Sequence, residues 1–368
     1  MNPDILREAF EMARLGAGQT SPNPMVGAVL VGENPFRVVG RGFHTWAGLE
    51  HAEILALREA GELANGSTLY ITLEPCCHQG RTAACTDALI RAGIRSVVAA
   101  MEDPNPMMRG KGFERLRAAG VEVEVASAFT REAEALNEPF VHHMRTGRPL
   151  VTLKAAVTLD GKIAAPEDNY GWITSESARA HVQQVRHAAD AILTGIGTVL
   201  ADDCRLTDRT GLPRSRPLVR IVLDSRLRLP VDSRLVASCR DDLVVFTTSA
   251  AAPERRRALE GRSVRVVALD GPQGRVDMRR VVDQLAGERC LSLMVEGGSK
   301  INWAFLEAAL ADKVLFYYAP KILGGMQSLP VAGGAGKRRR ADAILFHDLK
   351  LTVIPPDEFL VEAYLVKD

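Results

Sequence analysis

Residues 51 to 85 combine histidine, glutamate and clustered cysteines, and this stretch constrains the fold more than any other. His51 and Glu53 form an H-x-E sequence, Cys76 follows Pro75, and Cys85 comes after eight further residues. We expect each of these positions to fall where a strand or loop meets a helix. The fold must then let His51, Cys76 and Cys85 meet, as three ligands of a zinc ion whose fourth position stays open for water.

Glu53 indicates which kind of zinc site this is. It lies two residues after His51, at the start of a predicted helix, where its carboxylate can face a metal-bound water without binding the metal. A structural zinc site needs four protein ligands and no adjacent carboxylate, so the pattern favours a catalytic site. Cys77 and His78 are alternative ligands, although we expect both in the loop. Taken singly, such a histidine or cysteine would be an ordinary surface or core residue.

The composition is that of an ordinary globular protein with more than one domain. Its 368 residues exceed the size at which a single core stops growing. A net charge of +1 gives no overall attraction to nucleic acid, and no apolar run reaches the roughly 20 residues of a membrane span. The start, MNPDILREAF, lacks the pattern of a secretory signal, and six cysteines do not suggest a disulfide framework. We therefore expect a cytoplasmic protein.

Two series of predicted strands and helices follow one another along the chain. The first has helices over residues 2–15, 50–60, 86–92, 110–119 and 132–145, and strands over 25–32, 38–44, 67–73, 94–101 and 121–126. The second has strands over 151–157, 190–195, 218–225, 243–248, 264–270, 291–298 and 313–319, and helices over 176–188, 277–286 and 299–311. A Gly- and Pro-punctuated hinge at 145–150 separates them, which predicts two α/β domains, 1–147 and 148–368.

Glycine-rich junctions in the second series suggest a nucleotide site. No G-x-G-x-x-G sequence follows its first strand, so a Rossmann fingerprint is absent. Instead, TGIGTVLADD follows one predicted strand, and VEGGSKINWAF joins another to a helix whose first N–H groups can hold a phosphate. A Gly-Gly pair can also form a simple tight turn. Two such junctions, together with Lys154 on the first strand, favour nucleotide binding.

The motifs of both halves together resemble those of the bifunctional deaminase–reductase family of riboflavin biosynthesis, over the whole chain. In the first half they are SPNPMVGAV, GFH, HAE, TLEPCCHQGRTAAC and DPNP. In the second half they are RPLVTLKAAVTLDGKIA, WITS, ILTGIGTVLADD, VLDS, MVEGG and YYAPKILGG. The resemblance implies an N-terminal cytidine-deaminase-like three-layer domain and a C-terminal dihydrofolate-reductase-like domain. The family is often homo-oligomeric, so we expect a homo-oligomer.

For the first domain, the resemblance implies removal of the 2-amino group of 2,5-diamino-6-(5-phosphoribosylamino)pyrimidin-4(3H)-one. It implies one zinc ion per chain on His51, Cys76 and Cys85, with Glu53 as proton shuttle, as in zinc deaminases. The positions that match substrate contacts are Asn23 and His44 for the pyrimidine, and Arg81 and Thr82 for the ribose phosphate. The chain departs from zinc deaminases in general, because its two cysteine ligands are not spaced as C-x-x-C, and from the resembled family, because Cys77 stands where a serine is usual.

For the second domain, the resemblance implies that NADPH reduces the ribosyl group to a ribityl chain by hydride delivery to C1′. Lys154 is the catalytic candidate, because the reaction needs a charged group near the ring-opened, imine-like sugar. The cofactor contacts implied are Ala156, Trp172, Thr198, Asp202, Ser225, Gly298, Ser299, Lys300, Ile301, Asn302, Trp303 and Ala304. The substrate contacts implied are Arg186, Asp203, Leu206, Arg209 and Glu296. Asp203 or Glu296 would accompany Lys154, and the two arginines suit the phosphate.

Two further positions carry hypotheses of their own. Arg226 and Arg228, after VLDS, are candidate partners of the cofactor's 2′-phosphate. Tyr170 stands where the family commonly has a small substrate-binding serine, two residues ahead of Trp172. Either its hydroxyl replaces that of the serine or the loop follows a different path.

Two rival functions are less consistent with the sequence. A nucleic-acid-editing deaminase shares the zinc pattern but needs a basic or aromatic strand-binding surface. Residues 1–147 carry 14 Lys and Arg against 18 Asp and Glu, and aromatics are 5% of the chain. A metal-stabilised scaffold would not need Glu53 beside an incomplete zinc shell. We therefore expect a small-molecule substrate, with neither nucleic acid nor membrane as partner.

Overall fold

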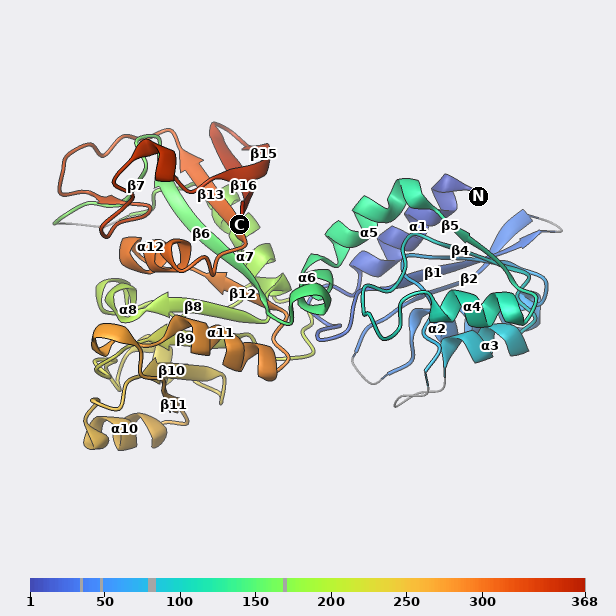
Figure 1. Ribbon diagram of the computed structural model, residues 1–368, viewed down its shortest axis with the longest axis horizontal. Helices are drawn as coiled ribbons and strands as arrows, with labels where there is room; N and C mark the ends of the chain where they lie inside the picture. The colour runs from blue at the N-terminus through green and yellow to red at the C-terminus, as the bar shows by residue number, and fades with distance from the viewer. Residues whose placement is uncertain (34–35, 47–48, 79–83, 168–170, 368) are drawn as a thin grey trace. The chain divides into compact units, whose positions relative to one another are not determined.

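The chain folds into two units, which the computed structural model describes for residues 1–33, 36–46, 49–78, 84–167 and 171–367 (Figure 1). One unit consists of Met1–Gly147 together with Pro213–Arg216, and the other of Arg148–Leu212 together with Pro217–Asp368. Each has its own main sheet and its own buried apolar clusters, so each is built around its own core.

A five-stranded mixed sheet forms the middle of the first unit. Its strand order is β2-β1-β3-β4-β5, in which β1 pairs antiparallel with β2 and β3, while β3, β4 and β5 are parallel. The strands are β1 (Gly27–Glu33), β2 (Phe36–Phe43), β3 (Thr68–Ile71), β4 (Ser96–Ala99) and β5 (Glu122–Val125). All five strands predicted for this half are confirmed, most of them shorter than expected.

Helices cover both faces of this sheet and give the unit three layers (Figure 1). Successive residues of β1 point to opposite faces: Ala28 and Leu30 pack into the cluster of α2, α3 and α4, and Val29 and Val31 into that of α1 and α5. The helices are α1 (Pro3–Arg14), α2 (Ala52–Ala60), α3 (Cys85–Arg91), α4 (Lys111–Ala118), α5 (Thr130–Leu136) and α6 (Glu138–Thr146), with short 3₁₀ turns η1 (Gly61–Ala64) and η2 (Ser127–Phe129).

The single helix predicted over 132–145 is wrong, because the chain bends at Asn137 between α5 and α6. Pro139 lies in the first turn of α6 and cannot donate the hydrogen bond that a continuous helix would need there. Asn137 is buried, and its side chain accepts from the Met25 N–H at 2.7 Å and donates to the Met25 carbonyl at 2.8 Å. The break therefore fixes the segment that leads into β1.

Two glycines let α2 lie directly on β2. A Cβ atom at Gly42 would lie 2.1 Å from the carbonyl oxygen of Ala52, and one at Gly40 would lie 2.2 Å from that of Ala56. Both distances are far inside van der Waals contact, so no larger residue fits at either position. The helix backbone therefore packs on the strand backbone without side chains between them.

The second unit is built on a nine-stranded sheet of order β11-β10-β9-β8-β12-β6-β13-β16-β15. It is parallel from β11 to β13, and β16 and β15 complete it as antiparallel strands. The strands are β6 (Leu150–Thr158), β8 (Ala191–Gly195), β9 (Val219–Leu223), β10 (Leu243–Thr247), β11 (Arg265–Ala268), β12 (Ser292–Val295), β13 (Lys313–Ala319), β15 (Phe346–Ile354) and β16 (Glu358–Leu365). A separate pair joins β7 (Lys162–Ala164) and β14 (Leu329–Pro330).

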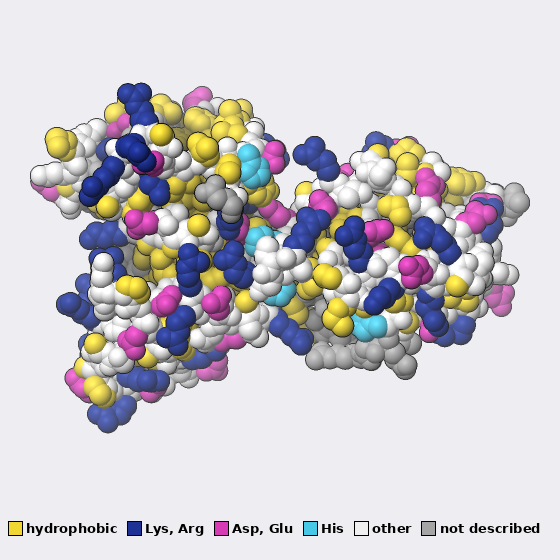
Figure 2. All heavy atoms as spheres, in the orientation of Figure 1, with side chains coloured by type: hydrophobic (Ala, Val, Ile, Leu, Met, Phe, Trp, Pro, Cys, Tyr) yellow, Lys and Arg dark blue, Asp and Glu magenta, His cyan; other side chains and the backbone are white. Residues whose placement is uncertain are grey.

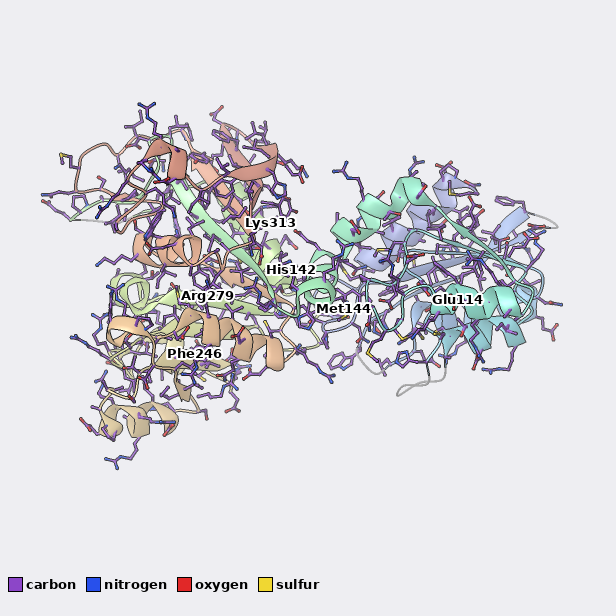
Figure 3. The ribbon with its side chains drawn as sticks, viewed as in Figure 1. Glu114, His142, Met144, Phe246, Arg279 and Lys313 are labelled. Atoms are coloured by element: carbon purple, nitrogen blue, oxygen red, sulfur yellow. The ribbon has the colours of Figure 1, made fainter. Side chains whose placement is uncertain are left out.

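This sheet also has helices on both faces. One apolar cluster joins it to α7, α8, α9 and α10, and the other joins it to α11 and α12. Phe246 of β10, which Figure 3 labels, is fully buried in the second cluster. The helices are α7 (Glu176–Ala188), α8 (Ile196–Asp202), α9 (Arg234–Ala237), α10 (Pro253–Glu260), α11 (Met278–Gly287) and α12 (Ser299–Glu307), with 3₁₀ turns η3 (Pro272–Gly274) and η4 (Arg340–Asp342).

Three sequence expectations for this unit need correction. TGIGTVLADD is a strand end followed by helix α8, and not only a glycine-rich turn. The helix predicted over 299–311 ends at Glu307. The C-terminal strands β15 and β16 were not predicted, although LKLTV within β15 alternates apolar and polar residues as a strand does.

Charged side chains of both signs are interspersed over the visible surface of each unit (Figure 2). Within the described residues, no helix combines the length and the apolar character that crossing a membrane requires.

Candidate functional site

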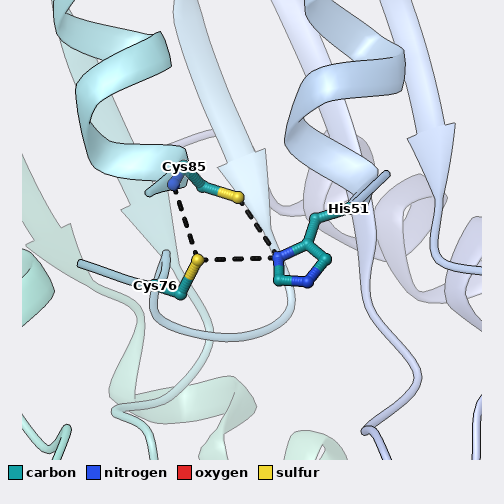
Figure 4. Close-up of side chains that lie close together, drawn as sticks. All are labelled: His51, Cys76 and Cys85. Atoms are coloured by element: carbon teal, nitrogen blue, oxygen red, sulfur yellow. Dashed lines mark hydrogen bonds between the residues drawn. The ribbon is translucent and has the colours of Figure 1, made fainter. Parts of the chain in front are cut away.

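Three metal-binding side chains meet in the first unit (Figure 4). His51 is the residue before α2, and Cys85 is the first residue of α3. Cys76 lies between β3 and α3, after the end of β3 at Ile71, so the helix junction expected at Cys76 is wrong. His51 Nδ1 lies 3.2 Å from Cys85 Sγ and 3.5 Å from Cys76 Sγ. The three donor atoms all lie within 4.8 Å of one another. The structure therefore brings together the three ligands that the sequence predicts.

These distances suit a tetrahedral zinc ion. Zn–N and Zn–S bonds of about 2.0 and 2.3 Å at tetrahedral angles give an N···S edge of about 3.5 Å. Hydrogen bonds from Cys85 and then from His51 lower the pKa of Cys76 to about 4. The hydrogen bond to Cys76 and burial raise the pKa of the Cys85 thiol, so the pair holds one thiolate, and a metal would release the second proton on binding. The donor set thus fits zinc.

Glu53 lies beside this cluster in the first turn of α2. Its side chain is buried, with 3% of the residue exposed. Burial, followed by the charge of Cys76, raises the pKa of Glu53 to about 7, while His51 acts in the opposite direction. This carboxyl can therefore gain or lose a proton near neutral pH, as a proton shuttle must.

Asn23 and His44 also adjoin the metal ligands. His44 is buried, and its ring stands edge-on to that of His51 with centroids 5.1 Å apart. Burial and then the neighbouring His51 lower the pKa of His44, so the ring is neutral. His44 Nδ1 lies 3.3 Å from the Glu50 carbonyl oxygen, and Nε2 lies 3.1 Å from Asn23 Nδ2. A neutral ring that donates at Nδ1 and accepts at Nε2 satisfies both contacts.

Glu74 is a structural part of the site that the sequence did not point to. Its buried carboxylate accepts the N–H groups of Asp103, Gly110 and Gly112 at 3.0, 2.9 and 2.8 Å. A Cβ atom at Gly112 would lie 2.2 Å from the carbonyl oxygen of Pro75, so the two segments touch closely. Glu74 thereby fixes the loop that carries Cys76. In the sequence, this role is indicated only by the position of Glu74, two residues before the metal ligand Cys76.

The remaining residues predicted around this site differ in what the structure describes. Cys77 is half-buried and His78 is exposed, and neither belongs to the donor cluster found among the described residues. Burial raises the pKa of the Cys77 thiol. Arg81 and Thr82 lie outside the described residues, and so does Tyr170 of the second unit.

In the second unit, Lys154, Glu296 and Arg186 form a buried network. Parallel pairing sets Val295 of β12 beside Leu153 of β6, which puts the next residue of each strand, Glu296 and Lys154, at one level. Lys154 Nζ lies 3.3 Å from Glu296 Oε2, and Arg186 binds both carboxylate oxygens of Glu296 at 2.6 and 2.9 Å. Burial favours the neutral acid, but Lys154 and Arg186 outweigh it and lower the pKa of Glu296 to about 2.

The two other predicted substrate residues with side-chain charge lie differently. Asp203 accepts the Arg234 N–H at 2.9 Å and is 51% exposed, so Glu296 and not Asp203 accompanies Lys154. Arg209 is exposed, while Leu206 is buried in the core, where only its backbone could meet a ligand.

The predicted cofactor residues gather mainly at the first turns of α8 and α12. A Cβ atom at Gly298 would lie 3.7 Å from Thr198 Oγ1, and one at Gly195 would lie 2.8 Å from Ile301 Cγ1, so the two turns are packed together. Ser299 Oγ, Asn302 Oδ1 and Trp303 Nε1 are buried atoms without a hydrogen-bond partner. Buried polar groups normally have partners, and a nucleotide can supply them. The residues therefore fit a dinucleotide cofactor.

The other predicted cofactor residues are spread over several elements of the second unit. Trp172 is 67% exposed, with the Arg179 guanidinium 4.8 Å from its ring centroid. Ser225 follows β9, and its Oγ accepts the Val276 N–H at 3.2 Å. The rest are Ala156 within β6, Asp202 at the end of α8, and Lys300 and Ala304 on α12; Arg226 and Arg228 are exposed after β9.

The two units define the class of the protein: a deaminase unit with a zinc-binding region, followed by a reductase unit. The family model described as the cytidine and deoxycytidylate deaminase zinc-binding region matches residues 2–101, and the RibD C-terminal domain matches residues 149–358. The chain belongs to the RibD family of riboflavin biosynthesis proteins, and is a bifunctional deaminase and reductase.

Relatives and solved structures agree along the whole chain. The riboflavin biosynthesis protein RibD of Actinobacillus pleuropneumoniae is 40% identical over 363 residues, which cover 99% of this chain and 95% of that protein. RibD of Escherichia coli is 40% identical over 96% of each. The structure of Acinetobacter baumannii RibD matches with a TM-score of 0.86 and 34% identity over 98% of each chain. These matches confirm the fold class and the function predicted from the sequence.

Proposed function

We propose that this chain catalyses two successive steps on one pyrimidine. Residues 1–147 hydrolyse the 2-amino group of 2,5-diamino-6-(5-phosphoribosylamino)pyrimidin-4(3H)-one, and residues 148–368 then reduce the ribosyl group with NADPH to give 5-amino-6-(5-phosphoribitylamino)uracil. The observation that carries this proposal is the meeting of His51, Cys76 and Cys85 beside the buried Glu53. A Thermotoga maritima structure named as a diaminohydroxyphosphoribosylaminopyrimidine deaminase and 5-amino-6-(5-phosphoribosylamino)uracil reductase supports it, with a TM-score of 0.83 and 34% identity over 99% of this chain and 98% of that one.

In the deamination step, His51, Cys76 and Cys85 hold one zinc ion per chain. When bound, zinc polarises a water molecule and lowers its pKa towards neutrality. Glu53 takes a proton as water adds to C2 of the pyrimidine, and passes it to the amino group, which leaves as ammonia. Asn23 and His44 orient the ring.

Two residues complete the deaminase site in this proposal. Arg81 and Thr82 hold the ribose phosphate, which rests on the resemblance alone because both lie outside the described residues.

In the reduction step, the first turns of α8 and α12 hold NADPH, with the cofactor's phosphates on the N–H groups that open α12. The partnerless Ser299 Oγ and Asn302 Oδ1 support this assignment. When bound, NADPH supplies the hydride for C1′. Lys154 carries the positive charge and the proton beside the ring-opened sugar, and the ionised Glu296 holds it in place.

The substrate phosphate is assigned to Arg209. Arg186 was the other candidate, but its Nε and Nη2 bind Glu296 and its Nη1 binds the Thr207 carbonyl oxygen. Arg186 therefore keeps Glu296 ionised, and the exposed Arg209 provides the cation for the phosphate. Arg226 and Arg228 remain candidates for the 2′-phosphate of NADPH.

The chain also assembles with a second copy of itself, through β15. This end strand exposes Leu349, Leu351 and Val353 by 63%, 62% and 73%, and apolar side chains gather there in Figure 2. An exposed apolar end strand is a surface for pairing with another chain. Light scattering on Leu351→Lys should give a smaller mass than the wild type, with Leu212→Lys, another exposed leucine, as control. Equal masses for all three proteins would exclude this interface.

We place the protein in the cytoplasm. All six of its cysteines are free thiols, including the two metal ligands, and the reducing cytoplasm preserves that state.

A two-stage assay on purified protein tests the proposed function. Ammonia release from the diaminopyrimidine phosphate is measured without cofactor, NADPH oxidation is measured after its addition, and zinc is counted on the same sample. We expect ammonia release with one zinc per chain, followed by NADPH consumption. Glu53→Gln should lose ammonia release with zinc retained, yet still oxidise NADPH when the deaminated compound is supplied. Lys154→Gln should release ammonia but consume no NADPH. Ammonia release without any NADPH consumption would remove the reductase assignment.

A further inference from the structure

One face of α7 holds the segment after α8, residues 203–210. Arg186 and His187 follow Gln183 by three and four residues. Their side chains therefore leave the helix on the side of Gln183. Arg186 Nη1 donates to the Thr207 carbonyl oxygen at 3.1 Å, and His187 Nδ1 lies 2.8 Å from Asp208 Oδ2. Two neighbouring residues of the segment are thus fixed to α7.

The third contact reaches the backbone of Arg209. Its N–H donates to Gln183 Oε1 at 3.0 Å. Residues 207, 208 and 209 are therefore each bonded to a different side chain of α7, and the position of the Arg209 backbone depends on that helix.

The His187–Asp208 pair is the most buried of these contacts. Their side chains are 3% and 9% exposed. Asp208 Oδ1 also accepts the N–H and the hydroxyl of Thr210 at 2.9 and 2.8 Å. Burial opposes ionisation, but the hydrogen bonds from Thr210 and His187 lower the pKa of Asp208. A charged, buried acceptor therefore faces His187 Nδ1, which donates to it.

The same segment has a backbone that needs to be held. Asp203 and Leu206 adopt φ angles of 40° and 53°, in the left-handed region where residues with a Cβ atom are disfavoured. Such conformations persist where the surroundings over-determine them, and they collect at ligand-binding sites. The contacts from α7 provide that constraint on one side, and burial of Leu206 in the core provides it on the other.

We propose that His187, Asp208 and Gln183 are positioning residues of the reductase, which hold Arg209 where its guanidinium meets the phosphate of the substrate. This inference rests on the proposed function, which assigns the phosphate to Arg209. The three residues do not touch the substrate; they act through the backbone of residues 207–209. They decide how strongly the enzyme prefers a phosphorylated substrate.

The test measures kcat/KM of reduction for the phosphorylated substrate and for the same compound without its phosphate. The ratio of the two values is the phosphate preference, which a general loss of folded enzyme does not change. His187→Leu removes the donor to Asp208, whereas His187→Asn has a similar shape and keeps a donor at the Nδ1 position. We expect the preference to fall about tenfold in His187→Leu and to stay within about twofold of the wild type in His187→Asn.

A second matched pair tests the same inference if His187→Leu does not fold. Gln183→Leu removes the acceptor for the Arg209 N–H, while Gln184→Leu changes an exposed glutamine of the same helix. We expect a lower phosphate preference only in Gln183→Leu. Ammonia release should be unchanged in all four variants, because none of them touches the first unit's site.

Arg209→Ala separates failure of this inference from failure of the proposed function. If Arg209→Ala leaves the phosphate preference unchanged, the proposed role of Arg209 is wrong and the inference falls with it. If Arg209→Ala lowers the preference but His187→Leu and Gln183→Leu do not, only the positioning inference is overturned. If all three variants lower the phosphate preference, the double variant of His187→Leu and Arg209→Ala should have the same preference as Arg209→Ala alone. This follows because His187 acts through the Arg209 guanidinium.

Discussion

Each unit contains a buried glutamate at its site, and the two carboxyls behave in opposite ways. Glu53 lies beside Cys76 and His51, and burial raises its pKa to about 7. Glu296 is also largely enclosed, with 13% of its side chain exposed, but Lys154 and Arg186 lower its pKa to about 2. Burial alone therefore does not decide the charge of a carboxyl, because neighbouring charges also act: the charge of Cys76 raises one pKa, and two cations lower the other.

The difference assigns different chemistry to the two residues. A carboxyl with a pKa near the working pH can accept a proton and return it within one turnover, which hydrolytic deamination requires. A carboxylate that stays ionised at every ordinary pH cannot shuttle protons, but it can orient a lysine and fix the field around a developing charge. Glu53 acts by accepting and returning a proton, and Glu296 acts through a negative charge that does not change.

Removing the exchangeable proton should have the largest effect. We expect Glu53→Gln to lower kcat of ammonia release by about 10²- to 10⁴-fold, because the amide can neither accept nor return the proton. Zinc content, measured by atomic absorption, should not change. A variant that loses its zinc together with its activity would show that Glu53 is needed for metal binding, and the comparison would fail.

Removing the negative charge of Glu296 should lower the rate by a smaller factor, and only for the reduction. We expect Glu296→Gln to lower kcat/KM of NADPH-dependent reduction by about 10²-fold, since Lys154 and Arg186 lose their shared counter-charge. Steady-state assays with the deaminated substrate measure this. Ammonia release is the internal control, and an equal loss there would indicate misfolding.

The two activities should also differ in their response to acid. Glu53 must be ionised to accept a proton, so kcat/KM of ammonia release should fall towards acid pH, with a pKa of about 7 if the metal-free value held. The charge of a bound zinc ion shifts this limb towards the ordinary value of 4.5. Glu296 contributes no limb above pH 4.5, because its folded pKa of about 2 keeps it charged there. Initial rates of both reactions between pH 5 and 8 measure this. An equal fall of the two rates towards acid pH would contradict the prediction.

The smallest effect is expected where the same pair of residue types is exposed. Arg265 binds Glu288 through both oxygens at 2.8 Å, as Arg186 binds Glu296, but the side chains are 47% and 36% exposed. Arg265→Ala should lower the free energy of unfolding by less than about 1 kcal/mol, because water screens the pair. Denaturant unfolding measures this, and a cost as large as that of breaking a buried pair, about 3–5 kcal/mol, would be inconsistent with our account.

The sequence predicted the first site better than the second for a physical reason. His51 and Cys85 stand at the starts of α2 and α3, and Cys76 directly follows Pro75 in the short segment after β3, so short motifs determine each ligand and its approximate place. Lys154, Arg186 and Glu296 come from β6, α7 and the end of β12, and only the strand pairing of a nine-stranded sheet brings them together. Residue types alone therefore left open whether Asp203 or Glu296 accompanies Lys154, and whether Arg186 binds phosphate.

Structural supports were the hardest to predict. Asn137 lies at a helix break and binds both backbone groups of Met25, and Glu74 accepts four N–H groups between residues 103 and 113. Neither partner set has a sequence pattern, because hydrogen bonds to backbone groups place no requirement on the identity of the partner residue. The strand β15 is a different case, because its LKLTV stretch carries the alternation of a strand and was overlooked.

The contact of Gly40 and Gly42 with α2 has a consequence for how this enzyme can change. Where side chains separate a helix from a sheet, exchanging one for another adjusts their spacing in small increments. Here backbone rests on backbone, so the smallest available change is a whole methyl group, which would push His51 and Glu53 away together. Substitutions at Gly40 or Gly42 can therefore change the position of Glu53 only by a large amount. Small adjustments of the deaminase site have to come from residues elsewhere around it.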